Sequence, residues 1–133
     1  MSIQSSILNS SQVLIVEDEA VTRTALIVLL EYQGAIVVSA GSIQGGIRAI
    51  ESGFQPDVLV SNIRLPDGNG ARVLEAVRRQ DAELGRRTIA IALTGEAIEM
   101  IRVDPESAGF QVYLSKPYDS GLLLNTIVRL MSN

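Results

Sequence analysis

Five short runs of apolar residues recur along the sequence, and longer segments of mixed polarity separate them. Most of these runs are continuous rather than alternating and are rich in β-branched residues, which is typical of strands buried on both faces of a parallel sheet. They cover residues 13–16, 35–38, 58–60, 89–93 and 112–114. The pattern therefore predicts five buried strands.

The intervening segments carry apolar residues at helical spacing. Residues 20–32 place Val21, Ala25, Val28 and Leu29 on one apolar stripe, and Gly34 follows where a left-handed cap would end the helix. Three further helices are predicted, each with its own apolar stripe or cap: one that begins after Ser42 and stops at Gly53, one over residues 72–80, and one that begins at Asp119 or Ser120.

The segment between the last two strands has an interrupted helical pattern. Residues 96–108 should form a helix, but Asp104-Pro105 falls inside it. Proline removes a backbone donor and disfavours helix at the residue before it. We predict a shortened or broken helix, with Pro105 starting a second turn.

The alternation of strands and helices defines the fold class. Five repeats of strand and helix predict an α/β, doubly wound, five-stranded parallel sheet covered by helices on both sides. A length of 133 residues fits one domain, which we place at residues 12–133. The polar, serine-rich residues 1–11 are expected to be a flexible N-terminal lead-in.

Composition excludes several kinds of chemistry. The chain has no histidine and no cysteine, which removes catalytic dyads and triads built on them, disulfides, and histidine or cysteine metal sites. The net charge of −4 argues against nucleic-acid binding by this domain. No apolar run approaches the roughly 20 residues that span a membrane, and the N-terminus does not read as a signal peptide. We expect a cytoplasmic protein.

Polar residues lie one or two positions after the end of four of the five predicted strands. Glu17 and Asp18 follow the first, Asn62 the third, Thr94 the fourth and Lys116 the fifth. Ligands of open parallel sheets bind beyond the carboxyl ends of the strands, so these side chains should converge there. Carboxylates, an amide, a hydroxyl and an ammonium group suit a divalent cation beside a phosphoryl group.

The sequences around these positions resemble the receiver domain of two-component response regulators, over residues 12–131. The segments that carry the resemblance are VLIVEDE from residue 13, PDVLVSNIRLPDGNG from residue 56, IALTG from residue 91 and GFQVYLSKP from residue 109. The family has a CheY-like, flavodoxin-like (βα)5 fold with strand order 2-1-3-4-5. Its members receive a phosphoryl group on an aspartate from a partner's phosphohistidine.

The resemblance implies a role for each matching residue. It places Asn62 at the phospho-acceptor position and gives Lys116 the phosphate-neutralising role. It implies Mg²⁺ ligands at Glu17, Asp18, Asn62 and the backbone carbonyl of Arg64. Thr94 and Tyr113 match the switch residues, and Pro117 matches a cis-proline. The expected partners are a histidine kinase or phosphotransfer protein, or a downstream effector.

Asn62 departs from the family pattern, in which this position is aspartate. An amide is a poor nucleophile, so we expect no phosphorylation of the chain as written. Losing one negative charge should also weaken Mg²⁺ binding, and Lys116 is free to pair with Asp18 or Glu17. We expect a signalling domain and not an enzyme.

Several interpretations of Asn62 stay open at this point. The chain is either a natural pseudo-receiver, a phosphorylatable receiver carrying an Asp-to-Asn change, or a phosphate-independent docking module. A haloacid-dehalogenase-like phosphotransferase is the least favoured alternative. That family needs two aspartates spaced two residues apart after the first strand, where this chain has Glu17 and Glu19.

Overall fold

The computed structural model describes residues 7–132. Its main sheet has five parallel strands in the order β2-β1-β3-β6-β7. These are β1 (Gln12–Val16), β2 (Ile36–Ala40), β3 (Val58–Asn62), β6 (Ile89–Thr94) and β7 (Val112–Ser115). The short strands β4 (Arg64–Leu65) and β5 (Gly68–Asn69) form a separate antiparallel pair. The predicted order 2-1-3-4-5 is confirmed, because β6 and β7 are the fourth and fifth strands of the main sheet.

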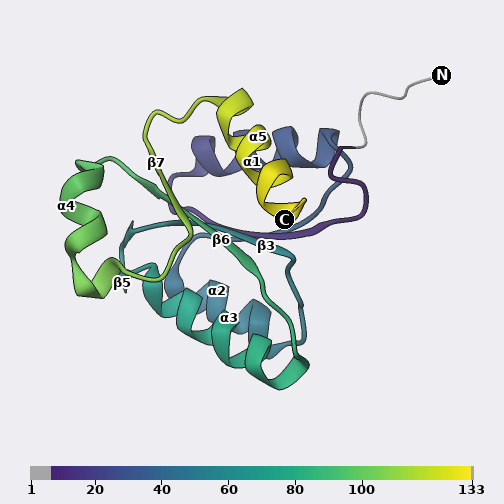
Figure 1. Ribbon diagram of the computed structural model, residues 1–133, viewed down its shortest axis with the longest axis horizontal. Coiled ribbons are helices and arrows are strands. Elements are labelled where there is room, and N and C mark those ends of the chain that lie inside the picture. The colour runs from purple at the N-terminus through teal and green to yellow at the C-terminus, as the bar shows by residue number, and fades with distance from the viewer. Residues whose placement is uncertain (1–6, 133) are drawn as a thin grey trace.

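Helices cover both faces of this sheet. Helices α1 (Ala20–Tyr32) and α5 (Ser120–Met131) lie on one side, and α2 (Ile43–Glu51) and α3 (Ala71–Leu84) lie on the other, as Figure 1 shows. Each layer seals its own apolar cluster against the sheet, one around Leu26, Leu30 and Ile127, the other around Ile43, Val73 and Val77. The doubly wound architecture is therefore confirmed.

Local capping explains where several helices begin and end. The Ser42 side chain accepts a hydrogen bond from the Gly45 amide at the start of α2, and Asp119 accepts one from the Leu122 amide at the start of α5. Gly34, after α1, has a φ of 96°, a conformation that glycine adopts without a steric cost. These three predicted boundaries are confirmed.

The interrupted helix is also confirmed. Helix α4 (Ile98–Val103) has only six residues, and the 3-10 turn η1 (Pro105–Ser107) replaces its continuation. Asp104 is extended between them and caps η1 by accepting a hydrogen bond from the Glu106 amide. Proline at the first position of η1 needs no backbone donor, so the break falls where the chain tolerates it.

The buried face of α1 differs from the predicted stripe. Leu26 and Leu30 are fully buried, whereas Val21 and Val28 are 75% and 61% exposed. Helix α1 carries apolar residues on most of its circumference, so helical spacing alone is compatible with two different apolar stripes. Packing against the sheet buries the stripe that contains the larger leucines.

The expected flexible lead-in also needs correction for its described part. Leu8 is completely buried in the apolar cluster beneath α1 and α5. Its amide donates to the Gln33 carbonyl at 2.9 Å, and the Ser10 amide donates to the Gly34 carbonyl at 2.9 Å. Residues 7–11 therefore pack against the domain, while residues 1–6 lie outside the described residues. No helix within residues 7–132 is long and apolar enough to cross a membrane.

A buried carboxylate fastens α3 to the start of β6. Asp81 accepts hydrogen bonds from the Thr88 hydroxyl at 2.7 Å and amide at 3.0 Å, and Arg78 pairs with it at 2.8 Å. Burial raises the pKa of Asp81, but the Thr88 hydrogen bonds and the Arg78 charge outweigh it, so the pKa lies below its ordinary value. Folding therefore favours the ionised carboxyl.

We predict that Asp81→Asn lowers the free energy of unfolding at pH 7 by about 1–2 kcal/mol, because an amide cannot accept all these hydrogen bonds. The stabilisation by Asp81 is present above the ordinary pKa of about 3.9 and is lost as the pH falls through the lower folded-state value. The difference in the free energy of unfolding between variant and parent should thus become smaller at acidic pH. Urea unfolding at several pH values measures it, with the exposed Glu83→Gln as the control expected to change little.

Candidate functional site

Four strands of the sheet deliver the predicted site residues to its carboxyl edge. Glu17 directly follows β1, Asn62 ends β3, Thr94 ends β6, and Lys116 directly follows β7. Hydrogen bonds connect three of these residues: Lys116 to Glu17, and Asn62 to Glu17. The structure therefore assembles the centre of the site that the strand-end pattern predicts.

Glu17 is the buried hub of this site, with no exposed surface. Its Oε1 pairs with the Lys116 ammonium at 2.9 Å. Its Oε2 accepts from the Glu19 amide at 2.9 Å and from the Asn62 side chain at 2.7 Å. The predicted pairing of Lys116 is resolved in favour of Glu17. A buried carboxylate needs such partners, because burying an unpaired charge is costly.

Asn62 presents its nitrogen to the acidic pair. Its Nδ2 donates to Glu17 Oε2 at 2.7 Å and to Asp18 Oδ1 at 3.0 Å. Its Oδ1 is buried and has no hydrogen-bond partner among the described residues. An amide NH₂ has two hydrogens, so both are used here. Asn62 therefore acts as a neutral donor that bridges two carboxylates.

The backbone at Asn62 is tightly enclosed. The Ser61 hydroxyl donates to the Asn62 carbonyl at 2.9 Å, and the Gly70 amide donates to the Ile63 carbonyl at 2.8 Å. A Cβ atom at Gly70 would lie 1.9 Å from the Asn62 carbonyl oxygen, so only glycine fits there. The main chain at Asn62 and Ile63 is thus held in place by the loop that follows it.

The loop after β3 is more than the solvated turn that its composition indicates. The Asp67 carboxylate accepts hydrogen bonds from the Ile43 and Gln44 amides at the start of α2, at 2.9 and 3.0 Å. These bonds hold the pKa of Asp67 below its ordinary value. Sequence reasoning missed this contact, because residues 24 and 23 positions apart carry no local signal.

Thr94 and Tyr113, the two expected switch residues, are both engaged. The buried Thr94 accepts a hydrogen bond from the Glu96 amide at 3.0 Å, in the turn that leads to α4. The half-buried Tyr113 donates its hydroxyl hydrogen to the Ser107 carbonyl at 2.7 Å and packs edge-on against Phe110. Their role as a switch stays a prediction.

A second polar network joins the loop after β3 to the turn η1. The Asn69 amide donates to the Ser107 hydroxyl at 3.0 Å, and that hydroxyl donates to Asp104 at 3.2 Å. Ser107 is fully buried, so these bonds satisfy a group shielded from water. Through Ser107 the loop after β3 is connected to Tyr113. Sequence reasoning placed none of these contacts.

Arg64 lies on the exposed rim of the site. Its guanidinium pairs with Glu96 at 3.2 Å, which joins the loops after β3 and β6. The hydrogen bond and charge of Glu96 raise the pKa of Arg64 above its ordinary value. The predicted metal-ligand role of the Arg64 backbone carbonyl stays a prediction. The Lys116-Pro117 bond is cis, as expected.

The donor set tests whether Mg²⁺ suits this site. Mg²⁺ prefers oxygen ligands, and Glu17 and Asp18 supply two adjacent carboxylates. Within residues 7–132, no cluster of three or more Asp, Glu, His or Cys side chains is placed to hold a metal ion. The third side-chain oxygen comes from Asn62, whose buried Oδ1 has no other described partner. The donor types therefore suit a cation, although in this structure the Asn62 nitrogen, and not its oxygen, faces the two carboxylates.

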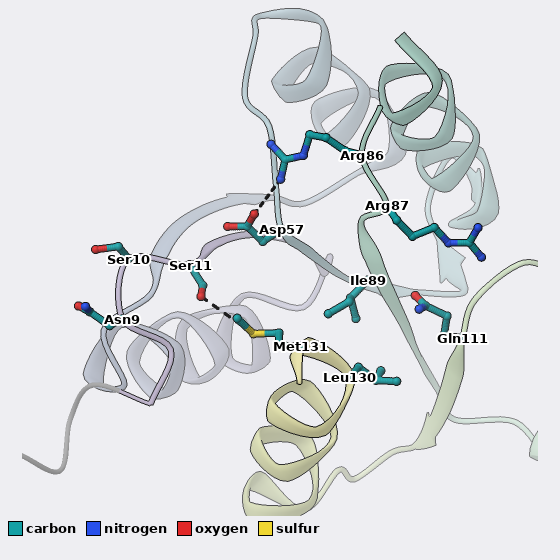
Figure 2. Close-up of a pocket in the computed structure, with 10 residues that line it drawn as sticks. All are labelled: Asn9, Ser10, Ser11, Asp57, Arg86, Arg87, Ile89, Gln111, Leu130 and Met131. Atoms are coloured by element: carbon teal, nitrogen blue, oxygen red, sulfur yellow. Dashed lines mark hydrogen bonds and ion pairs between the residues drawn. The ribbon is translucent and has the colours of Figure 1, made fainter. Parts of the chain in front are cut away.

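A separate pocket of about 590 Å³ lies at the opposite end of the sheet, where the strands begin (Figure 2). Ile89, Leu130 and Met131 form its apolar lining. Arg86 reaches into it but already pairs with Asp57 at 2.7 Å. None of the predicted site residues lines this pocket, so it is not part of the site at the carboxyl edge.

The fold and the site together define a class: an α/β signalling domain with an acidic pair, a hydroxyl and a lysine at the carboxyl edge of its sheet. The family model of the response regulator receiver domain matches residues 13–128. The chain therefore belongs to the response regulator receiver domain family of two-component signalling.

Two sequence relatives illustrate this relationship. An uncharacterised 14.6 kDa protein of Leptolyngbya boryana is 36% identical over 80% of this chain and 79% of its own length. The KDP operon transcriptional regulatory protein KdpE of Escherichia coli is 33% identical over 85% of this chain but only 48% of KdpE. The chain thus spans about half the length of that regulator.

A solved structure supports the same assignment. The receiver domain of the sensor histidine kinase PA1611 from Pseudomonas aeruginosa has a TM-score of 0.80 and 29% identity, with 93% of this chain and 99% of that chain covered. That structure is described with a magnesium ion coordinated in its active-site cleft.

Proposed function

We propose that this receiver domain signals through protein contacts and does not itself accept a phosphoryl group. The observation that carries the proposal is the Asn62 amide, which donates both its hydrogens to Glu17 and Asp18. We assign Asn62 to the phospho-acceptor position from the resemblance to the family. The amide therefore occupies the acidic site as a donor, where the family has a carboxylate nucleophile.

The chemistry of phosphoryl acceptance supports this conclusion. A carboxylate oxygen attacks phosphorus with an available lone pair and a full negative charge. The lone pair of an amide nitrogen is delocalised into the carbonyl, and both Nδ2 hydrogens are engaged here. The amide oxygen is neutral and faces away from the acidic pair. With no carboxylate at residue 62 and no histidine or cysteine in the chain, the proposed role is recognition and not turnover.

Mg²⁺ binding at this site is proposed to be weak. Glu17, Asp18, the Asn62 side-chain oxygen and the Arg64 backbone carbonyl would hold the ion. When bound, Mg²⁺ neutralises the acidic pair. Lys116 already supplies one positive charge to Glu17 at 2.9 Å, and the Asn62 amide supplies two hydrogen bonds to the pair. Both interactions compete with a cation, and affinity also follows the number of charged ligands.

The proposed partners follow from the family. Receiver domains contact histidine kinases, phosphotransfer proteins and effectors, and this chain contains no histidine of its own. A phosphohistidine must therefore come from the partner. Because Asn62 offers no nucleophile, such a partner is expected to dock on this domain and keep its phosphoryl group.

The test is exposure of the unmodified chain to acetyl phosphate and Mg²⁺ at neutral pH, followed by intact mass spectrometry. We expect the mass to stay unchanged over a time in which a phosphorylatable receiver domain becomes modified. A stoichiometric, acid-labile increase by the mass of one phosphoryl group would overturn the proposal.

A further inference from the structure

The two polar ends of the Asn62 amide have opposite environments. The nitrogen donates two hydrogen bonds to carboxylates, at 2.7 and 3.0 Å, while the oxygen is buried without a described partner. Asn62 as a whole is only 4% exposed, so water does not readily satisfy that oxygen. A buried acceptor left unpaired destabilises the folded state. The observed orientation therefore gives the two carboxylates hydrogen-bond donors and leaves the carbonyl oxygen without one.

The charges of Glu17 and Asp18 favour the NH₂ end of the amide over the carbonyl end. Two carboxylates without a cation attract the NH₂ group and repel the carbonyl oxygen. A divalent cation between them reverses both preferences, because the hydrogens of NH₂ carry partial positive charge and the carbonyl oxygen is a hard ligand. Half a turn about the last side-chain torsion exchanges the two ends, and such torsions are broad and soft.

The surrounding contacts confine any response to the side chain. The Asn62 carbonyl receives the Ser61 hydroxyl, and Gly70 packs so closely against it that no Cβ would fit. Ile63, the next residue, is fully buried. The backbone is therefore held in place, and a response to a cation is expected in the side-chain amide.

We infer that Asn62 is a cation-responsive toggle. This inference rests on the proposed function, in which the acidic site is retained without phosphoryl acceptance. Without a divalent cation, Asn62 Nδ2 bridges Glu17 and Asp18. With one, Asn62 turns its Oδ1 toward the pair and releases both hydrogen bonds. The site then responds to a divalent cation without accepting a phosphoryl group.

The geometry also predicts that this response needs a high cation concentration. Turning the amide breaks two charge-assisted hydrogen bonds and moves the NH₂ group to the buried position now held by Oδ1. There the described residues offer no partner to the oxygen, and a donor placed in that position is desolvated in the same way. Each cost lowers the affinity relative to a site with three carboxylates.

The test follows the side-chain amide signals of ¹⁵N-labelled protein during titration with MgCl₂, with NaCl at matched ionic strength as the control. The Asn62 pair is assigned as the one missing from the Asn62→Ala spectrum. The side chain of Asn125, which is exposed on α5, serves as the internal reference. We expect the Asn62 pair to shift saturably with Mg²⁺, together with the backbone amides of Glu17 and Asp18, while Asn125 and the NaCl series stay unchanged.

Two results would overturn the toggle. In one, Glu17 and Asp18 respond to Mg²⁺ but the Asn62 side-chain signals stay in place, so the cation binds without amide rotation. In the other, nothing near the site moves at tens of millimolar Mg²⁺, so the amide is a fixed bridge. Neither result affects the mass-spectrometric test, which fails only if a phosphoryl adduct forms.

Discussion

Asn62→Asp is expected to convert this chain from one that gains no phosphoryl group into one that does. The change supplies the missing carboxylate, and Lys116, Thr94 and Asp18 are already present at the same edge of the sheet. The new carboxylate oxygen would attack the phosphorus of acetyl phosphate, form an acyl phosphate and release acetate. Intact mass spectrometry with and without Mg²⁺ measures the outcome directly.

The same substitution should make stability depend on Mg²⁺. It removes the two hydrogen bonds that Asn62 donates and places a third negative charge beside Glu17 and Asp18. We expect the free energy of unfolding without metal to fall by about 1–3 kcal/mol. A ligand that binds only the folded state restores stability in proportion to ln(1 + [L]/Kd), so Mg²⁺ should raise the melting temperature of the variant more than that of the parent.

Two further variants test whether the effects of Asn62→Asp require both the added carboxylate and its location at residue 62. Asn62→Ala removes the amide without adding a carboxylate and should gain no phosphoryl group. Asn125→Asp makes the same charge change on an exposed part of α5 and should leave both the mass and the Mg²⁺ dependence as in the parent. If Asn62→Asp also stays unmodified, the site differs from an active receiver at more than the acceptor position.

The fold was predictable because its signals are local and repeated. Each buried strand is a short apolar run, and capping residues such as Ser42 and Asp119 mark helix starts in the sequence itself. Pro105 likewise predicts the break after α4 from backbone chemistry alone. The convergence of Glu17, Asn62 and Lys116 followed from one general rule, that the carboxyl ends of parallel strands share an edge.

The errors arose where the outcome depends on packing between distant segments. Helix α1 has apolar residues on opposite sides, so its period was correct but its buried face was not. Leu8 lies in a serine-rich stretch whose composition indicates flexibility, yet the gap beneath α1 and α5 accommodates it completely. In both cases the sequence is compatible with two arrangements, one buried and one exposed, and packing against the rest of the core determines which one forms.

The orientation of the Asn62 amide could not be predicted from the sequence, for a different reason. It depends on which of two nearly identical ends satisfies the neighbouring charges, and this is known only when Glu17 and Asp18 are placed. The contact of Asn69 with Ser107 is similar, since it joins two loops 38 residues apart. The residue types in a sequence predict which side chains come together at a site. They do not predict which atoms of those side chains form hydrogen bonds with each other.

Replacing Lys116 by methionine should cause a large loss of stability. Methionine keeps most of the apolar length of lysine and removes the ammonium that pairs with Glu17 at 2.9 Å. Glu17 is completely buried, and its Oε1 then loses this partner. Removing one partner of a buried pair typically costs 3–5 kcal/mol. Because the Lys116 side chain is 29% exposed, water offsets part of this cost, and we expect a loss of about 2–3 kcal/mol.

Urea unfolding of three variants isolates the contribution of the charge. Lys116→Met carries the full loss, and adding Glu17→Gln to it should recover part of the stability, because the remaining side chain is then neutral. Arg64→Met breaks the exposed pair with Glu96 and should change little, since solvent-exposed ion pairs contribute little to stability. A double-mutant cycle over Glu17 and Lys116 gives their coupling energy. A cost for Lys116→Met as small as that for Arg64→Met would show that Glu17 does not depend on the ammonium, and that Asn62 and the Glu19 amide suffice to hold its charge in the interior.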